Sequence, residues 1–285
     1  MGVVIREART EDARECGRIC YEAFRAIAGA HNFPPDFSSV EHATGLYSML
    51  IGHAGCYAVV AEEGGRILGS SLLHEQGNIA GIGPVTVDPE CQNKGVGREL
   101  MLAVTARRER RGLPGIRLVQ AGYHSRSLAL YTMLGFETRE HLSCLQGAPI
   151  GKALPGFPVR PAAAADLAAC DALALRVHGH TRSNELTGGI ARGTATVVER
   201  NGRITAYTSH LGYLGHACAE TTEDLAALIA SASAFAGPGI LVPSRNGELL
   251  RWCLAQGLRI TQTMTLMTIG LYNEPAGAYL PSVLY

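Results

Sequence analysis

Hydrophobic and polar positions alternate along the first 140 residues with two different periods. Short runs rich in β-branched residues, bounded by glycine, proline or charged residues, predict strands, whereas apolar residues that recur every three or four positions predict helices. The predicted strands lie at residues 3–8, 56–62, 66–75, 79–87, 116–120 and 136–140. The predicted helices lie after Thr10 and at residues 40–51, 98–111 and 125–134. This alternation by itself indicates the α/β or the α+β class.

Parts of this pattern recur in the second half of the chain, and the sequence offset between matching segments decreases along the chain. The segment Ile5–Asp12 matches Val159–Asp166 at an offset of 154 residues, including an arginine, an alanine and an aspartate. Two further pairs are the turns 65–67 and 202–204, at an offset of 137, and the segments 134–136 and 256–258, at an offset of 122. We therefore predict a duplicated chain whose second copy has lost two short stretches.

A glycine- and proline-rich stretch at residues 147–158 separates the two copies. Such composition is typical of an interdomain linker, so we predict a first domain at 1–146 and a second at 159–285. The final segment, residues 271–285, is apolar and aromatic, and segments of that kind are usually docked on the protein. It could cover a substrate cleft, or it could seal the contact between the two copies.

The composition excludes several classes of function. Lys plus Arg equals Asp plus Glu, 25 each, so no net charge attracts nucleic acid or an acidic membrane. The eight cysteines form no CxxC pair, which argues against a zinc site or a disulfide framework. The chain starts without a signal-peptide pattern and contains no apolar run of 18 residues. We expect a cytoplasmic protein, monomeric or homodimeric, without a metal and without a nucleic-acid or membrane partner.

The most informative stretch is PVTVDPECQNKGVGREL, residues 84–100. It predicts a strand that ends at Pro89, then a turn with Gly95 and Gly97, and then the start of a helix. The first backbone N–H groups of a helix have no intrahelical partner and attract anions, and glycine lets the main chain approach a phosphate closely. The stretch is neither a Walker A loop nor a dinucleotide fingerprint. The alternative is an ordinary tight turn.

The full string V-x-V-x-P-x-x-Q-x-x-G-x-G-x-x-L resembles motif A of the GNAT superfamily of acyl-CoA-dependent N-acyltransferases. The resemblance covers about Val4 to Glu140 and implies a twisted, mixed α/β sheet flanked by helices, so that the duplication would give two GNAT-like domains. It also implies acetyl-CoA as co-substrate, with its pyrophosphate on backbone N–H groups and its pantetheine along the end of the fourth strand. The implied cofactor-binding residues are Val85, Thr86, Val87, Gln92, Asn93, Lys94, Gly95, Val96, Gly97, Arg98, His124 and Tyr131.

A second motif, residues 124–136, resembles the family pattern N-x-x-A-x-x-L-Y-x-x-x-G-F. The resemblance implies that Tyr131 protonates the departing thiolate of CoA, whereas the alternative is a tyrosine that only packs on the sheet. The sequence departs from the pattern at His124 and Ser127, where the family usually has asparagine and alanine. In the second copy the position of Tyr131 holds Trp252 or Cys253, and no QxxGxG is present. The second copy is therefore expected to be inactive.

The attacking amine must lose a proton, so a carboxylate or histidine is expected as general base. The candidates are Glu75, His74 and His124, and the resemblance implies that the loop at residues 31–36 forms part of the acceptor wall. We predict an N-acetyltransferase that passes the acetyl group of acetyl-CoA to a small-molecule amine or a peptide by direct attack. The alternatives are a non-catalytic acyl-CoA-binding or partner-recognition module and a protein-lysine acetyltransferase. The pattern does not indicate which amine is the acceptor.

Overall fold

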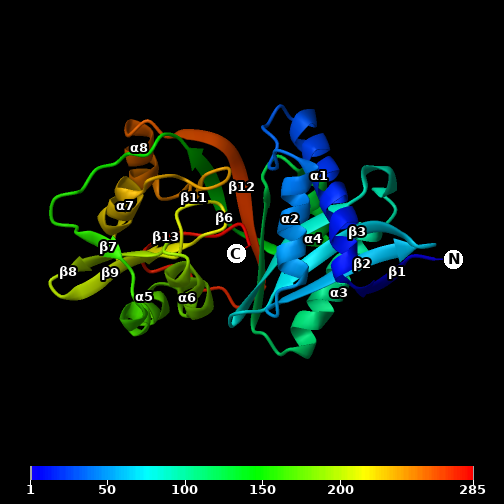
Figure 1. Cartoon of the computed structure of the whole chain (residues 1–285), viewed down its shortest axis with the longest axis horizontal. Coiled ribbons are helices and arrows are strands. Elements are labelled where there is room, and N and C mark those ends of the chain that lie inside the picture. Colours follow the sequence, from blue (N-terminus) through cyan, green and yellow to red (C-terminus); the bar gives the residue numbers. More distant parts are fainter. Residues whose placement is uncertain (1, 285) are drawn as a thin grey trace.

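Two repeats of the same ten elements follow each other along residues 2–284, which the computed structural model describes (Figure 1). The first repeat consists of β1 (Val4–Glu7), α1 (Ala13–Ala30), α2 (Val40–Ile51), β2 (Cys56–Glu63), β3 (Arg66–His74), β4 (Ile79–Val87), α3 (Val96–Arg110), β5 (Gly115–Ala121), α4 (Ser125–Met133) and β6 (Glu137–Gln146). The second repeat consists of β7 (Val159–Pro161), α5 (Leu167–His178), α6 (Ser183–Ala191), β8 (Thr196–Arg200), β9 (Arg203–Thr208), β10 (Ala217–Ala219), α7 (Thr222–Ser231), β11 (Ile240–Pro243), α8 (Gly247–Ala255) and β12 (Arg259–Gly270). A last strand, β13 (Ala278–Leu280), has no counterpart in the first repeat.

An identical ion-pair cluster at the start of both repeats supports the duplication. Its members are Arg6, Asp12 and Glu62 in the first repeat and Arg160, Asp166 and Glu199 in the second. The arginine Nε donates to the glutamate at 2.6 Å in the first repeat and at 2.8 Å in the second. In both repeats Nη1 donates to the aspartate at 2.7 Å. The cluster joins the first strand of each repeat to the turn after it and to the neighbouring strand.

The strands form an eight-stranded sheet, β1-β2-β3-β4-β5-β12-β6-β11, and a five-stranded sheet, β13-β10-β9-β8-β7, within the described residues. The last strand of each repeat is inserted into the other repeat: β12 pairs antiparallel with both β5 and β6, and β6 pairs with both β12 and β11. Figure 1 shows β12 and β6 between the helices of the two halves. The linker lies between the repeats, whereas the hydrogen bonds of the larger sheet cross that boundary.

The mixed α/β class agrees with the sequence prediction, and most element bounds agree within one residue, whereas two bounds differ by more. Helix α3 starts at Val96, two residues before the expected start, because the backbone turns into the helix directly at Gly95. Strand β6 continues to Gln146, beyond the expected end at 140, because β12 pairs from Glu137 to Gln146 and β11 pairs with residues 142–145. Neither extension is visible in local periodicity.

Helices cover both faces of the first half of the larger sheet. On one face α1 and α2 pack against β2 and β3 around the buried Ile19, Tyr47 and Leu72. On the other face α3 packs against β2, β3 and β4, and α4 joins the same cluster through Tyr131. No helix among residues 2–284 is long and apolar enough to span a bilayer.

The two halves differ at the strand that precedes the third helix of each repeat. In the first repeat β4 pairs in parallel with β5 at only four positions, from Ile79 opposite Gly115 to Ile82 opposite Leu118, and the strands then separate. In the second repeat β13 pairs antiparallel with β10, with Cys218 opposite Tyr279. The chain's own terminal strand thus lies beside β10, where β5 lies beside β4 in the first repeat.

Candidate active site

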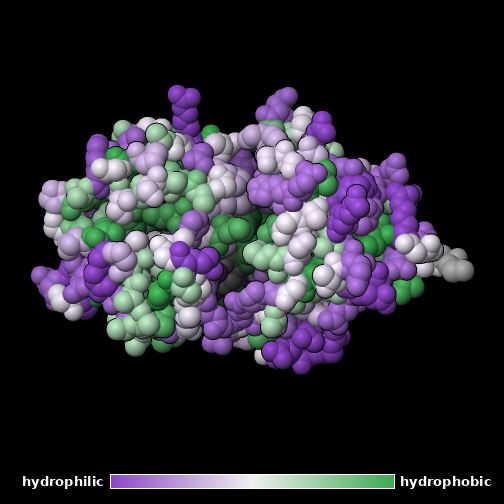
Figure 2. All heavy atoms as spheres, in the orientation of Figure 1, coloured by the Kyte–Doolittle hydropathy of each residue, from purple (hydrophilic) through white to green (hydrophobic). Residues whose placement is uncertain are grey.

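A cavity of about 1020 Å³ opens where β4 and β5 separate. Residues 83–87 of β4 form one side and residues 119–121 of β5 form the other. The cavity continues from there between the two repeats, and Figure 2 shows the surface hollowed at this place, with hydrophobic residues in the walls. This is the kind of concave, largely pre-formed space in which small ligands bind.

The loop that follows β4 forms an anion cradle at one end of the cavity. Gly95 precedes α3 with φ of +84°, a left-handed conformation that favours glycine, and a Cβ added there would meet no atom within 4 Å. Because the first helical hydrogen bond runs from the Glu99 N–H to the Gly95 carbonyl, the N–H groups of residues 96–98 have no intrahelical partner. These donors and the helix dipole favour a phosphate.

The predicted cradle residues that line the cavity are Gln92, Asn93, Gly95, Val96, Gly97 and Arg98. Lys94 is exposed and is not among the described lining residues. Position 95 requires glycine because of its left-handed backbone conformation and not because of close packing. A Cβ at Gly97 would lie 3.5 Å from the side chains of Val87 and Leu130, an ordinary contact, so that position tolerates a small side chain.

Arg126, which sequence reasoning missed, ties the cradle to α4. Its guanidinium donates to Gln92 Oε1 at 2.9 Å and to Asn93 Oδ1 at 3.3 Å, and it lines the same cavity. The cradle therefore has a fixed positive charge beside its free N–H groups. The arginine lies within the second family motif, but no spacing rule connects it to the glycine loop 30 residues earlier.

The end of β4 offers a free strand edge to the cavity. Val85, Thr86 and Val87 pair with β3 on one side, and on the other side β5 has already separated. The Thr86 side chain is buried, and its hydroxyl is within hydrogen-bond distance of Tyr47 Oη at 3.2 Å and Ser70 Oγ at 3.1 Å. These partners occupy the hydroxyl of Thr86, so its main chain is the part available to an extended ligand.

Tyr131 lies on α4 and lines the cavity. The residue is 7% exposed, and its ring packs edge-on against Phe136 at 6.0 Å between centroids. Burial raises the pKa of Tyr131 to about 12, so the hydroxyl keeps its proton at neutral pH and can donate a hydrogen bond. The two motifs thus meet in one cavity.

His124 immediately precedes α4 and also lines the cavity. Burial, together with the positive charges of Arg126 and His31, lowers the pKa of His124 to about 4. The imidazole is therefore neutral at pH 7. It can accept or donate a hydrogen bond there, but it does not carry a charge.

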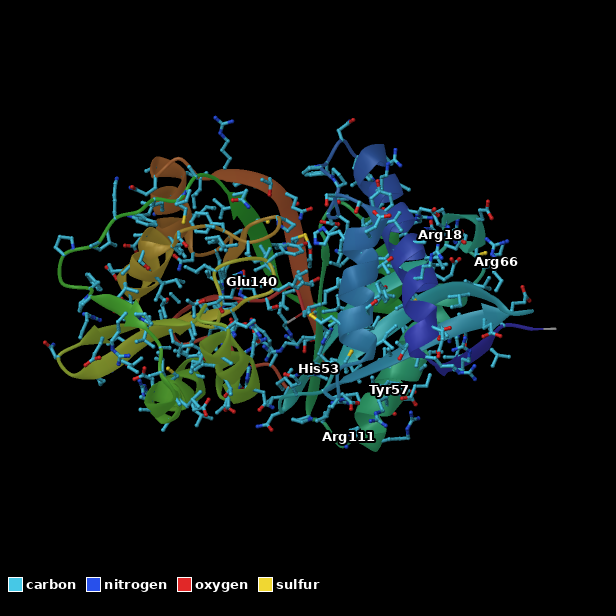
Figure 3. All side chains as sticks on the ribbon, in the orientation of Figure 1. Arg18, His53, Tyr57, Arg66, Arg111 and Glu140 are labelled. Carbon is cyan, nitrogen blue, oxygen red and sulfur yellow. The ribbon has the colours of Figure 1, made fainter. Side chains whose placement is uncertain are left out.

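The structure does not bring Glu75 or His74, the other two base candidates, to the cavity walls. Glu75 accepts hydrogen bonds from Arg107 at 2.7 and 3.1 Å, and Arg111 lies 3.8 Å away; Figure 3 shows Arg111 just after the end of α3. His74 Nε2 contacts the Gly83 carbonyl at 2.8 Å. The ion pair with Arg107 gives Glu75 a structural role. Because Arg107 lies 32 residues further along the chain, local sequence could not reveal this partner.

The second repeat completes the other end of the cavity. Its lining residues include Glu185, Arg192, Ser209, Tyr213, Gln262, Met264, Val283 and Leu284. The terminal segment is fixed by a hydrogen bond from the Val283 N–H to the Tyr213 carbonyl at 2.8 Å, and the Leu284 side chain lies 3.7 Å from the Cβ position of Gly83. The end of the segment thus lines the cavity, while its strand β13 pairs with β10 of the second repeat.

The second repeat has no equivalent cradle. Helix α7 begins after Thr221, whose side chain accepts a hydrogen bond from the Asp224 N–H at 3.2 Å, so the helix end is already capped. The fully buried Asp224 carboxylate, which pairs with Arg200 at 2.8 Å, lies at the same end and would repel an anion. Because α4 and α8 have equal length, Tyr131 corresponds to the buried Cys253 and not to Trp252.

Comparison with known proteins identifies the first half. Residues 20–136 match the sequence model of the Acetyltransferase (GNAT) family. Residues 20–136 of this chain belong to a GNAT acetyltransferase domain. Proteins of this family are acyltransferases that use acetyl-CoA as co-substrate and amines as acceptors. No protein of curated function matches the sequence.

Two solved structures share the fold of nearly the whole chain, including both repeats. A putative acetyltransferase from Pyrococcus horikoshii has 17% identity and a TM-score of 0.70, with 98% of this chain and 94% of that chain covered. A GCN5-related N-acetyltransferase from Sphaerobacter thermophilus has 13% identity and a TM-score of 0.62, with 95% and 96% covered. The arrangement of the two repeats therefore also occurs in other solved structures.

Among residues 2–284, no group of three or more His, Cys, Asp or Glu side chains is placed to hold a metal ion. All eight cysteines are free thiols, and seven of them are buried. Burial raises the pKa of the Cys16 and Cys56 thiols to about 12, which keeps them protonated. These two thiols are therefore poor nucleophiles.

Proposed function

We propose that the first repeat transfers the acetyl group of acetyl-CoA directly to an amine in the cavity between β4 and β5, and that the second repeat is not catalytic. One observation carries the proposal. The left-handed Gly95 cradle, the free edge of β4 and the Tyr131 hydroxyl all face one cavity, and the second repeat has none of these features. The proposed division follows the linker, with 1–146 as the acetyl-CoA domain and 159–285 as its non-catalytic partner.

In this proposal the pyrophosphate of CoA binds the N–H groups of residues 96–98, with Arg126 beside it. The pantetheine amides then pair with the edge of β4 at residues 85–87, as one more strand would. This path leads from the cradle along β4 toward the inner part of the cavity. The thioester would thus lie between Tyr131 and the part of the cavity that the second repeat lines.

The reaction needs two proton transfers. The protonated amine first loses one proton to a base, its nitrogen attacks the thioester carbon, and the C–S bond then breaks to give the amide and the thiolate. The second nitrogen proton neutralises the thiolate, so that CoA leaves as the thiol. Tyr131, with its pKa raised to about 12, is a weaker acid than a thiol of pKa about 8.5. Its role is therefore to stabilise the sulfur by a hydrogen bond, not to give up its proton completely.

The shape of the cavity favours a small acceptor over a lysine on a folded protein. Residues 209–210, 213–214, 236–238 and 283–284 close the side of the cavity that faces the second repeat. A protein surface could reach the thioester only if these segments moved. The presence of Tyr131 beside the cofactor path argues against a module that only binds acyl-CoA.

The test combines binding with turnover. We expect acetyl-CoA and CoA to raise the melting temperature of the full chain, and we expect thiol release when amines are added to acetyl-CoA. Binding without thiol release over a broad amine panel would favour the non-catalytic module. If neither acetyl-CoA nor CoA shifts the melting temperature, the cofactor site itself is assigned incorrectly.

A further inference from the structure

A carboxylate without a basic partner lines the part of the cavity where the acceptor would bind. Asp36 belongs to the loop between α1 and α2, and it lines the cavity together with Gln262 of β12. None of the ion pairs found within residues 2–284 includes Asp36. Because an ionised carboxylate is costly to bury unless a cation or several donors compensate it, this site is suited to a positive group.

The surroundings of Asp36 are mainly aromatic and aliphatic. Among the lining residues, Phe24 and Phe37 stack at 6.0 Å between centroids, and Tyr123 is held by stacking at 4.2 Å on Phe33, which lies outside the described lining. The wall opposite comes from the second repeat and the tail, including Tyr213, Met264 and Leu284. Such walls remove an apolar body from water and also attract a cation through the faces of their rings.

Other charged groups line the same cavity, but their charges are compensated or lie elsewhere in it. Glu185 pairs with Arg182 and is also 3.0 Å from His216 Nδ1. Arg126 is bound to the cradle loop. Arg192 also lines the cavity, and its positive charge would repel an ammonium from its own end. Asp36 is thus the acidic group that an ammonium could pair with directly.

We propose that the acceptor is a small primary amine on an apolar or aromatic body, whose ammonium group is bound by Asp36. This inference rests on the proposed acetyl transfer and adds the class of acceptor to it. The carboxylate would take the first proton from the bound ammonium, which leaves a neutral nitrogen to attack the thioester, and would later release that proton to water. Burial raises the pKa of Asp36, which makes the carboxylate a stronger base than an exposed aspartate.

The proposal predicts a specific loss of acetyl transfer in Asp36→Asn, a substitution that keeps the size of the side chain and removes its charge. With phenethylamine and isoamylamine as probes, we expect kcat/KM to fall about 100-fold or more because the cation and the base are lost together. The melting-temperature shift by acetyl-CoA should stay within error of the wild type, which also reports that the variant is folded. Asp36→Glu should recover part of the activity.

The matched control is Glu41→Gln, which removes a negative charge from an exposed residue at the nearby start of α2, outside the described cavity lining. We expect kcat/KM to change by less than about twofold in this variant, because an exposed charge is screened by solvent. An equal loss in Glu41→Gln and Asp36→Asn would show that the overall field matters and would overturn the role of Asp36.

The acceptor class is tested separately with phenethylamine, phenylalanine and a lysine-containing peptide. We expect phenethylamine to be the best substrate by about tenfold or more, because the cavity that offers its ammonium a carboxylate would repel a second carboxylate nearby. If the wild type acetylates the peptide or phenylalanine better, the proposed class is wrong while acetyl transfer stands. If it neither binds acetyl-CoA nor releases thiol, the proposed function fails instead.

The tail should set the size of the body that fits. Leu284→Ala should raise KM for isoamylamine and improve bulkier amines such as naphthylethylamine, by several-fold each, because it removes apolar contact and opens space. Leu254→Ala, at a 42% exposed position on α8, is the control and should change neither. Unchanged preference in Leu284→Ala would show that the tail does not touch the acceptor.

Discussion

The third helix of each repeat begins in a different way, although the surrounding fold is the same. In the first repeat Gly95 leaves the helix N-terminus open, and nothing occupies the space where its Cβ would be. In the second repeat the Thr221 side chain caps the helix, and the buried Asp224 adds a negative charge. An anion site on this fold thus depends on the loop before the helix, which spans residues 88–95 in the first repeat and only residues 220–221 in the second.

The strand gap beside that helix shows the same contrast. In the first repeat the gap between β4 and β5 is open to the cavity, whereas in the second β13 pairs with β10 and fills the corresponding position. The terminal segment then continues into the cavity of the first repeat, as far as Leu284. We infer that the second repeat serves the first by holding this segment in place. The following predictions test this contrast.

The largest effect is expected from Gly95→Val. A β-branched residue at φ of +84° costs on the order of 1–3 kcal/mol, and its side chain enters the space proposed for the pyrophosphate. We expect the Kd of acetyl-CoA, measured by calorimetry, to rise by about 100-fold or more. Gly202→Val is the control, because Gly202 has a similar φ of +69° in the β8–β9 turn, outside the described cavity lining. Unchanged affinity in Gly95→Val would remove the cradle assignment.

The next effect should come from Tyr131→Phe. Loss of the hydrogen bond to the departing sulfur should lower kcat by about 10- to 100-fold, while the Kd of acetyl-CoA stays within about twofold. The counterpart Cys253→Ala should leave kcat unchanged if the second repeat is not catalytic. A fall in kcat in Cys253→Ala, with stability preserved, would contradict the contrast between the repeats.

A smaller effect is expected at His124, which replaces the usual asparagine of the motif. Because its pKa is lowered to about 4, the imidazole is neutral on both sides of pH 7, and its titration cannot shape the rate there. We therefore expect His124→Asn to change kcat less than about threefold and to leave the pH profile between about pH 6 and 8 unshifted. A displaced acidic limb in this variant would identify His124 as the base.

The smallest effects concern the ion-pair cluster that the repeats share. Asp12→Ala and Asp166→Ala should each lower the free energy of unfolding by about 1–3 kcal/mol at pH 7, since each aspartate also accepts a backbone hydrogen bond. We expect the larger loss for Asp12, because Arg6 is less exposed than Arg160, 24% against 40%.

The pH dependence of these two variants has a defined sign. The arginine lowers the pKa of each aspartate in the folded state, so the stabilisation is complete above the pKa of the unfolded chain, about 4, and is lost as the pH falls through the folded value. The difference between wild type and variant in urea unfolding should thus shrink in acid. A difference that grew below about pH 4 would contradict the assignment.

Much of the fold and half of the site could be read from the chain itself. The strand, the glycine turn and the helix of residues 84–100 depend on neighbours within a few positions, as do Tyr131 and the repeat of the Arg6–Asp12 segment. Glu75 shows the opposite case. It was a reasonable base at the end of a strand, but its side chain pairs with Arg107 on α3, so it is not free to take part in chemistry at the cavity.

The acceptor end was decided only by the tertiary structure. Asp36 and Gln262 meet although 226 positions separate them, and β12 reaches them only because it inserts between β5 and β6. Pairing of strand edges depends on twist and on which edges remain free, and no local period of hydrophobic residues records that choice. The sequence alone therefore determined the elements and the phosphate cradle. Contacts between distant segments decided three other features: the exchange of β6 and β12, the position of β13 beside β10 and the place of Leu284 in the cavity wall. These contacts form only when the chain is folded.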